Sequence, residues 1–304
     1  MKINSKHSNT FDSIGVAAAL LTASGWSLAG IFIRLLPDIS AYCIVAGRFT
    51  VALVVMMPLL WLLQKDRITF IRSLQYAEYW HMSVIVVGCC TLGTTAFQMA
   101  PVGEVTLLMS TAPLFVVVYK LLNREKIQKN ESLGILFALL GITFILVPEF
   151  STTETATLHR LLGNGLALLV ALLMAYYAFR FRLLNQRGQA PDEKIVTLLT
   201  LALGSIVLWA VTAVVPNAIK TIVLDQQVLV AFAGLGIICT AIPTLGYAIA
   251  SRRLPPILTT TVLLVEPIFA VVFAYLILKE VPSPLLVPGG LLVLGGLVFI
   301  SKSK

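Results

Sequence analysis

The sequence predicts an all-α integral membrane protein with ten transmembrane helices, arranged as two inverted five-helix repeats. Three observations support this prediction. Apolar residues form blocks long enough to cross a bilayer, basic residues are distributed unevenly among the loops, and short motifs recur in the same order in both halves of the chain.

The apolar blocks set the fold class. Of the 304 residues, 58% are hydrophobic and 12% are charged, with a mean hydropathy of +0.94, whereas a soluble domain is about half apolar and about a quarter charged. A helix needs roughly 20 largely apolar residues to cross the hydrocarbon core. Span-length windows predict ten spans, at residues 13–36, 41–63, 81–100, 102–122, 131–148, 161–182, 194–215, 228–250, 256–278 and 285–300.

Basic residues give an independent test of that count. With both termini in the cytoplasm, 17 of the 22 basic residues fall in inner segments and four in outer segments, and Arg48 lies within span two. The positive-inside rule expects this bias when the number of spans is even. The charge pattern therefore predicts ten spans with both ends cytoplasmic.

Short motifs recur in order between the two halves. The equivalent pairs are Arg34-Leu35-Leu36 and Arg182-Leu183-Leu184, Cys90-Thr91 with Thr95 and Cys239-Thr240 with Thr244, Pro113-Leu114-Phe115 and Pro267-Ile268-Phe269, Glu125 and Glu280, and Gly134 with Gly141 and Gly289 with Gly296. Because each unit has five spans, the second copy enters the membrane from the opposite side. Inverted repeats of this kind are a recurring architecture of secondary transporters, with the substrate site near mid-membrane.

The predicted organisation follows from the repeat. It comprises a cytoplasmic N-terminal tail (1–12), a first repeat (13–148), an external linker (149–160) and a second repeat with a short cytoplasmic C-terminal tail (161–304). The apolar run that starts at Ile14 is long for a cleavable signal, so we expect it to stay as span one.

Several function classes are disfavoured. The net charge of +8 is spread thinly over many loops, so no nucleic acid partner is expected. The four cysteines lie in apolar segments without CxxC or Cys/His spacing, which indicates neither disulfides nor a metal site. Nucleotide-binding glycine motifs are absent and no cofactor is expected. His7, His81 and His159 are scattered, so an integral-membrane lipid-modifying enzyme is a weaker alternative and no enzyme is predicted.

These motifs resemble the EamA-type carriers of the drug/metabolite transporter (DMT) superfamily. The resemblance is clearest in residues 100–146, with Pro113 and Glu125, and in residues 259–300, with Val265-Glu266-Pro267 and Leu278-Lys279-Glu280. It implies two inverted five-helix units around a central cavity, lined by spans three, four, eight and nine with spans one and six beside them. It also implies small metabolites as substrates, often exported.

Two charged residues are predicted inside spans, where a charge costs about 2.5–3.5 kcal/mol on insertion scales and usually faces a cavity or a partner. Glu266 is interpreted as a proton carrier or an anchor for a substrate amine, or else as a structural acceptor for hydroxyls and Arg48. Pro267 is expected to loosen the helix there. Arg48 is interpreted as a site for a substrate carboxylate or phosphate, or else as a structural residue that pairs with helix-end carbonyls or an acid.

Uncharged side chains complete the predicted substrate-binding or coupling site. They are Gln98, Tyr247, Trp26, Tyr176, Thr95, Thr244 and Thr260. Many membrane hydroxyls bond the preceding turn of their own helix, which is the competing interpretation for the threonines. Glu104, in the turn between spans three and four, is expected to face water or to guard the outer mouth.

The sequence thus predicts an alternating-access transporter for an amino acid-like or other small amphipathic metabolite, with export as the expected direction. A multidrug or toxic-compound proton antiporter of the same fold is the alternative. The expected partners are the lipid bilayer and a small-molecule substrate, protons are left open, and the chain is expected to be a monomer or a weak homodimer. By resemblance, the expected location is the bacterial inner membrane.

Overall fold

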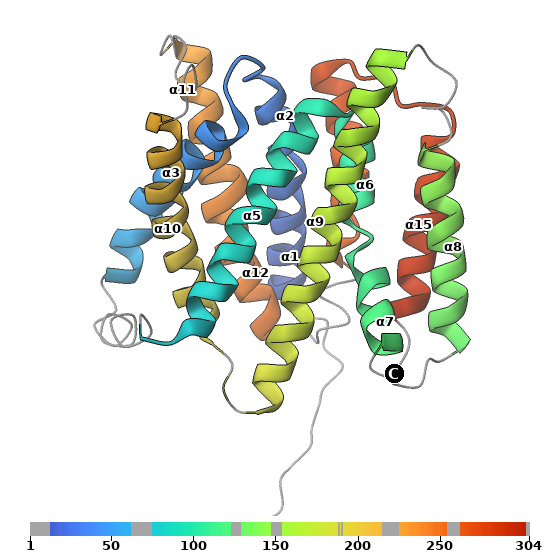
Figure 1. Cartoon of the computed structure of the whole chain (residues 1–304), viewed down its shortest axis with the longest axis horizontal. Helices are drawn as coiled ribbons and strands as arrows, with labels where there is room; N and C mark the ends of the chain where they lie inside the picture. The colour runs from blue at the N-terminus through green and yellow to red at the C-terminus, as the bar shows by residue number, and fades with distance from the viewer. Residues whose placement is uncertain are drawn as a thin grey trace, which may run out of the picture.

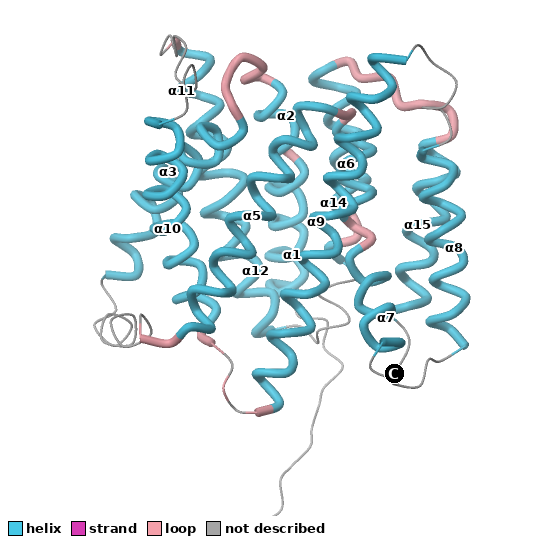
Figure 2. The backbone as a smooth tube through the Cα atoms, in the orientation of Figure 1, coloured by secondary structure: helices cyan, strands magenta, loops and turns pink. Residues whose placement is uncertain are grey.

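The computed structural model describes residues 13–61, 75–122, 129–146, 154–187, 189, 191–214, 225–253 and 262–301. These residues form helices, with short turns between some of them, and no β-strand occurs among them (Figure 2). The helices are α1 (Ser13–Ser27), α2 (Ala29–Arg34), α3 (Ala41–Trp61), α5 (Ala77–Met99), α6 (Val102–Met109), α7 (Ala112–Leu122), α8 (Lys129–Leu146), α9 (Glu154–Gln186), α10 (Glu193–Val214), α11 (Gln226–Ala233), η2 (Gly234–Ala241), α12 (Ile242–Arg253), α14 (Glu266–Phe273), η3 (Ala274–Leu278) and α15 (Leu286–Ser301). The predicted all-α class is confirmed for the described part of the chain.

Six helical segments in the described residues are long and apolar enough to cross a membrane. They are Ser13–Arg34, Ala41–Pro58, Ala77–Met99, Leu158–Phe181, Ile195–Val214 and Gln226–Tyr247. Three shorter apolar helices, Ser132–Ile145, Glu266–Leu278 and Leu286–Phe299, correspond to predicted spans five, nine and ten. Predicted span four is divided between α6 and α7. A multi-pass membrane protein is therefore supported, while ten crossings remain a prediction.

Helix α9 begins earlier than the sequence suggests. It starts at Glu154, so it runs through more than half of the segment predicted as a linker. Arg160 lies in this extension and forms an ion pair with Glu104 of α6. That contact ties the first turns of α9 to a helix that the sequence alone does not place beside it.

The first helix of each repeat packs mainly against the other repeat. Helix α1 contacts α12 and α14, whereas α9 contacts α5, α6 and α7. The contacts are close: a Cβ on Gly25 of α1 would lie 2.6 Å from the Ile238 carbonyl oxygen of η2. We call α1, α2, η2, α12, α14 and η3 the α1 group, and α5, α6, α7 and α9 the α5 group. Each group combines helices from both repeats.

Two further helix pairs flank these groups (Figure 1). Helices α3 and α10 pack together at one side, and α8 and α15 pack together at the other. In the second pair, a Cβ on Gly141 would lie 2.5 Å from the Gly289 carbonyl oxygen, and a Cβ on Gly296 would lie 2.5 Å from that of Gly134. Glycines at these equivalent positions let the two backbones meet, as is common between membrane helices.

Candidate functional site

A cavity of about 450 Å³ lies between the helix groups. Its lining comes from α1, α2, α3, α5, α6, α9, α10, η2, α12 and α14, so both repeats contribute. Pockets of about 300–1,000 Å³ with apolar walls and a few polar groups are typical small-molecule sites. The apolar lining includes Phe49, Phe97 and Met109, and the charged lining residues are Arg48 and Glu266.

Arg48 reaches the cavity from α3 and binds η2. Its Nε donates to Thr240 Oγ1 at 2.5 Å, and its Nη2 donates to the Cys239 carbonyl oxygen at 3.0 Å. The planar guanidinium suits two neighbouring acceptors of this kind. Arg48 thus pairs with a carbonyl inside the π-helix rather than at a helix end, and its side chain also faces the cavity.

The segment that Arg48 binds, η2, has wider helical turns than the helices on either side of it. Residues of η2 form a π-helix within the described part of span eight. Thr240 Oγ1 donates to the Leu235 carbonyl oxygen five residues earlier, at 2.8 Å. Helical π-turns are frequent at functional sites because they redirect side chains and carbonyls. Here the wide turn presents the Cys239 carbonyl and the Thr240 hydroxyl to Arg48.

Glu266 lies at the first position of α14 and lines the cavity. Pro267 occupies the first turn of this helix, where a missing N–H and a fixed φ are tolerated. Residues 262–263 are also helical, and residues 264–265 form a turn between them and α14, so the helical path is interrupted directly before Pro267. The carboxylate has no hydrogen bond or ion pair with any residue that the structure describes, so the predicted contact with Arg48 is not formed.

Predicted span four has a break at the equivalent position. Helix α6 ends at Met109, and α7 starts at Ala112, followed by Pro113. Ser110 Oγ and Thr111 Oγ1 fill the break by donating to carbonyl oxygens of α6, at 2.8 Å and 2.6 Å. Both repeats thus place a helix start beside their Pro-containing motif, but Ala112 stands where the second repeat has Glu266.

The other predicted site residues divide into two sets. Trp26 and Thr244 line the cavity. Gln98, Tyr247, Tyr176 and Thr95 are not among the described lining residues, and Thr260 lies outside the described part of the chain.

Most of these polar groups have other partners. Gln98 Nε2 donates to the Ile39 carbonyl oxygen at 2.7 Å, and Tyr176 Oη lies 3.1 Å from His81 Nε2. Thr95 Oγ1 donates to the Thr91 carbonyl oxygen of its own helix. Tyr247 packs against the lining residue Trp26, with ring centroids 5.9 Å apart.

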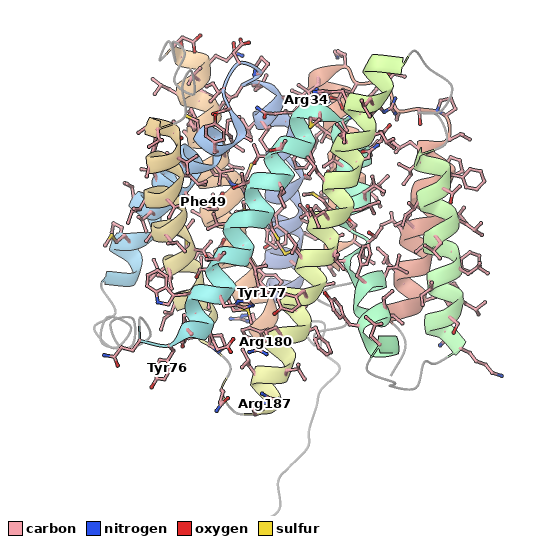
Figure 3. The ribbon with its side chains drawn as sticks, in the orientation of Figure 1. Arg34, Phe49, Tyr76, Tyr177, Arg180 and Arg187 are labelled. Carbon is pink, nitrogen blue, oxygen red and sulfur yellow. The ribbon has the colours of Figure 1, made fainter. Side chains whose placement is uncertain are left out.

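Sequence reasoning missed the contribution of α10. Val196, Thr197, Thr200 and Leu201 of this helix line the cavity, although the resemblance implies spans three, four, eight and nine with one and six. The i, i+3 spacing of Thr197 and Thr200 places two hydroxyls on one helix face, which is the signal that the sequence offered. Tyr177 of α9 also lines the cavity; Figure 3 labels it between α5 and α9.

Three thiols line the same cavity. Cys89, Cys90 and Cys239 contribute to its wall, and all four cysteines of the chain, including Cys43, are free. Among the described residues, no group of three or more His, Cys, Asp or Glu side chains has an arrangement that could hold a metal ion.

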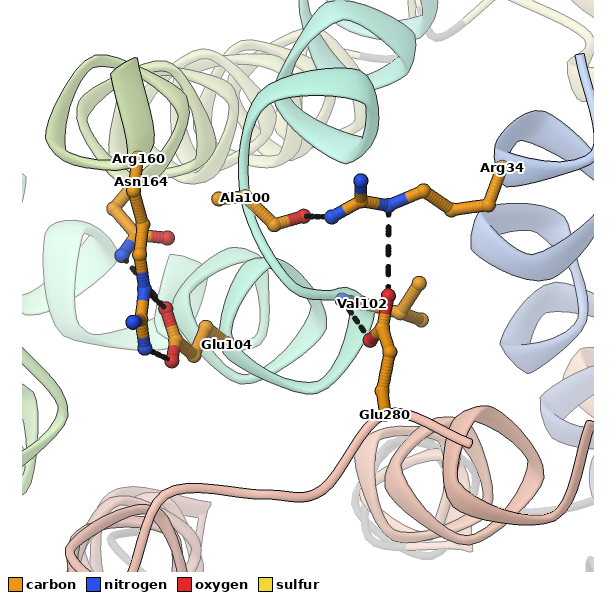
Figure 4. A network of polar contacts seen from close by, with 7 residues as sticks. All are labelled: Arg34, Ala100, Val102, Glu104, Arg160, Asn164 and Glu280. Atoms are coloured by element: carbon orange, nitrogen blue, oxygen red, sulfur yellow. Dashed lines mark hydrogen bonds and ion pairs between the residues drawn. The ribbon is translucent and has the colours of Figure 1, made fainter. Parts of the chain in front are cut away.

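A polar network connects helices at the Arg34 end of the bundle, the upper end in Figures 1 and 3. Arg34 Nη2 donates to the Ala100 carbonyl oxygen at 2.7 Å, and Arg34 Nε lies 3.5 Å from Glu280 Oε1. Glu280 Oε2 accepts from the Val102 backbone N–H at 3.0 Å (Figure 4). This N–H belongs to the first turn of α6, where a carboxylate is favourable.

Glu104 belongs to the same end but to a separate cluster (Figure 4). It accepts from Arg160 Nε at 2.9 Å and from Asn164 Nδ2 at 3.1 Å, and Arg160 Nη2 contacts its other oxygen. Glu104 is only 1% exposed, so the expectation that it faces water is wrong. Its partners lie more than 50 residues away in the sequence, which hid the pairing from local inspection.

The sequence matches the EamA-like transporter family over residues 13–147 and 161–302. The chain belongs to that family. The family match and the apolar helices establish a membrane transporter of the DMT superfamily, as the motifs predicted.

This EamA-like transporter was also compared with solved structures and with curated proteins. One solved structure, titled "Crystal structure of protein", aligns with a TM-score of 0.65 and 16% identity, covering 94% of this chain and 95% of the other. This likeness shows a shared fold. No curated protein matches the sequence.

Proposed function

We propose that this EamA-like transporter moves a small amphipathic, amino acid-like metabolite by alternating access, with the solute bound in the central cavity. The observation that carries the proposal is one cavity with a carboxylate and a guanidinium in otherwise largely apolar walls. A zwitterion offers an ammonium group to Glu266 and a carboxylate to Arg48. Its apolar part would contact Phe49, Phe97 and Trp26.

Glu266 is the residue we assign to the solute amine or to a coupling proton. A carboxylate in a membrane protein usually has a partner, because an unpaired charge there is costly. Glu266 has none among the described residues, and the start of α14 favours its negative charge. A bound cation or a proton would supply the missing partner.

Arg48 is the residue we assign to the solute carboxylate. Two of its nitrogens already bind Cys239 and Thr240, which fixes the plane of the guanidinium. A guanidinium held in this way keeps further N–H groups for an anion without losing much rotamer freedom on binding. Arg48 therefore combines the two interpretations of its role, structural and substrate-binding.

The proposal is tested by counterflow with purified protein in liposomes. A thermal-shift screen of zwitterionic and amphipathic metabolites first finds ligands, since a ligand that binds the folded state raises its melting temperature. We expect saturable uptake that is stimulated by solute on the opposite side. Uptake proportional to concentration, without such stimulation, would instead indicate a channel and contradict alternating access.

Glu266→Gln then separates the two roles of the carboxylate. If Glu266 carries the coupling proton, the variant retains counterflow of solute but loses accumulation driven by a pH gradient. If Glu266 binds the amine, counterflow itself falls by about tenfold or more, as expected for loss of about 1.5–3 kcal/mol from a charged hydrogen bond. Unchanged transport under both conditions would exclude both roles.

A multidrug proton antiporter is the second candidate. The aromatic and apolar lining favours it, because a lipophilic cation needs apolar contact and one carboxylate. The Arg48→Gln variant distinguishes the candidates: a zwitterion loses its carboxylate partner, whereas a lipophilic cation loses a repulsive charge and should bind as well or better.

The membrane orientation is part of the proposal. We infer that both termini are cytoplasmic, which places the Arg34 end outside, and that the chain resides in a bacterial inner membrane. The bias of basic residues supports this orientation. Reporter fusions at the two termini test it, and termini on opposite faces would contradict an even number of crossings.

A further inference from the structure

The ion pairs of the described chain differ in which helices they connect. Arg160–Glu104 joins α9 to α6, and Arg180–Glu78 joins α9 to α5, so both lie within the α5 group. Arg34 belongs to α2 of the α1 group, and Glu280 follows η3 of the same group. Each nevertheless binds the backbone of the α5 group, Arg34 at Ala100 and Glu280 at Val102. Of these three ion-pair clusters, only that of Arg34 and Glu280 connects the α1 group to the α5 group.

The same clusters differ in how readily water can replace their contacts. The Glu104 side chain is 2% exposed, so opening its contacts would leave a buried carboxylate without a partner. The side chains of Arg34 and Glu280 are 30% and 24% exposed. Partly hydrated groups lose less when they separate, because water can take over their hydrogen bonds. Arg180 and Glu78, each 34% exposed, can also separate at low cost, but their contact lies within the α5 group. The Arg34–Glu280 cluster is therefore the contact between the groups that can open and close at low cost.

Packing at the boundary is consistent with repeated separation. A Cβ on Gly30 of α2 would lie 2.8 Å from the Phe97 ring, and one on Gly103 of α6 would lie 2.8 Å from Val271 Cγ2. Both are contacts with the ends of side chains. Within the α1 group, Gly25 meets the Pro243 ring and also a backbone atom, the Ile238 carbonyl oxygen, although Gly234 meets only the Phe32 ring. Side-chain ends can part and repack more easily than interlocked backbones.

We propose that Arg34 and Glu280 form a latch that closes the cavity at the Arg34 end and must open for the solute to pass there. This proposal rests on the transport function proposed above. Ile33, next to Arg34, lines the cavity, and Phe97, three residues before Ala100, lines it as well. The latch therefore lies directly over the lining, and its opening joins the cavity to that face of the membrane.

The backbone conformation of Lys279 determines where Glu280 lies in the latch. It has a φ of 58°, the one positive φ at a non-glycine residue in the described chain, and it ends η3. A left-handed residue at a helix end reverses the chain direction. The reversal directs Glu280 back toward Val102, and the Glu280 N–H donates to the Ala274 carbonyl oxygen at 3.3 Å.

Thiol labelling from one side of the membrane tests the latch without knowledge of the solute. Cys90 lines the cavity and serves as the reporter once Cys43, Cys89 and Cys239 are replaced by alanine. A membrane-impermeant thiol reagent is added separately to right-side-out and to inverted vesicles. A second protein with Asp38→Cys, in the exposed turn after α2, identifies the orientation that presents the Arg34 end.

We expect Glu280→Ala to raise the Cys90 labelling rate from the Arg34 end by about tenfold or more, since the loss of a charged hydrogen bond shifts an equilibrium by that factor. Glu280→Gln should give a smaller rise, because its amide oxygen still accepts from Val102. Glu78→Gln is the matched control: it breaks an ion pair inside the α5 group and should change labelling less than twofold.

Two results would overturn the latch. Either Glu280→Ala and Glu280→Gln both label at the parental rate, or Glu78→Gln raises labelling as much as they do. Because Glu280→Gln nearly preserves side-chain shape, it keeps the test valid if Glu280→Ala fails to fold. A labelling rise in a protein that shows no counterflow with any solute would support the latch while contradicting the proposed transport, so the two failures are distinguishable.

Discussion

Spans three and eight carry the same Cys-Thr motif, but the two helices differ. Helix α5 is continuous from Ala77 to Met99, and Thr91 donates to the carbonyl of Val87 four residues earlier. The equivalent Thr240 lies in the π-helix η2 and accepts from Arg48. Spans four and nine differ in a similar way, with Ala112 and Glu266 at equivalent helix starts. The repeats share a backbone plan but supply different polar groups, since Arg48 comes from the first repeat and Glu266 and the π-helix come from the second.

The largest expected effect comes from moving the carboxylate to the other repeat. Ala112→Glu should destabilise the protein by about 2.5–3.5 kcal/mol, because it adds a charge within the membrane at a residue that does not line the described cavity. Glu266→Ala should not destabilise it, since it removes a charge that has no partner among the described residues. Reversible unfolding in mixed detergent and denaturant measures both. Equal destabilisation by the two variants would contradict the assignment of Glu266 to an external ligand.

The two threonines of the repeated motif give the next effect. Thr240→Val should cost about 1.5–3 kcal/mol, the range for a hydrogen bond to a charged group, since Arg48 loses an acceptor. Thr91→Val removes a hydroxyl that bonds only its own helix among the described contacts, and should cost less than about 0.5 kcal/mol. The same unfolding assay compares them. A Thr91 effect as large as that of Thr240 would mean that the π-helix has no special role.

A smaller effect is expected where the repeats remain alike, in the pair α8 and α15. Gly296→Ala should destabilise the protein by about 1–3 kcal/mol, because the new Cβ would lie 2.5 Å from the Gly134 carbonyl oxygen. Gly295→Ala is the matched control: its Cβ meets nothing within 4 Å. That variant should be neutral or slightly stabilising, since alanine favours a helix over glycine. Similar losses from both would show that the backbones do not pack as described.

The sequence was informative about the repeat and about charge. Glu266 and Arg48 stood out because charges within apolar blocks are rare, and the ordered motifs pointed to a shared plan for the two halves. The sequence indicated less well which face of each helix lines the cavity. In a membrane both the lipid and the protein interior are apolar, so the hydrophobic periodicity that orients a helix in a soluble protein is weak. That is why the lining by Thr200 of α10 was missed and why Gln98, which bonds the Ile39 carbonyl, was expected at the cavity.

Long-range partners account for the remaining differences. Arg48 binds a carbonyl 191 residues away, and Glu104 binds Arg160 across 56 residues. No local pattern specifies such contacts, because they depend on how the two repeats pack together. The same holds for Pro267: its position in the sequence fits a kink or a helix start, and only the surrounding helices determine which occurs.

The exchange of first helices between the repeats bears on how the chain matures during synthesis. Thr22 of α1 donates to the carbonyl oxygen of Pro243, 221 residues later. At about 5–20 residues per second, the ribosome needs roughly 10–45 s to make the intervening chain. During that time α1 sits in lipid without its final neighbours, and a protein truncated before span eight would expose that helix to quality-control proteases.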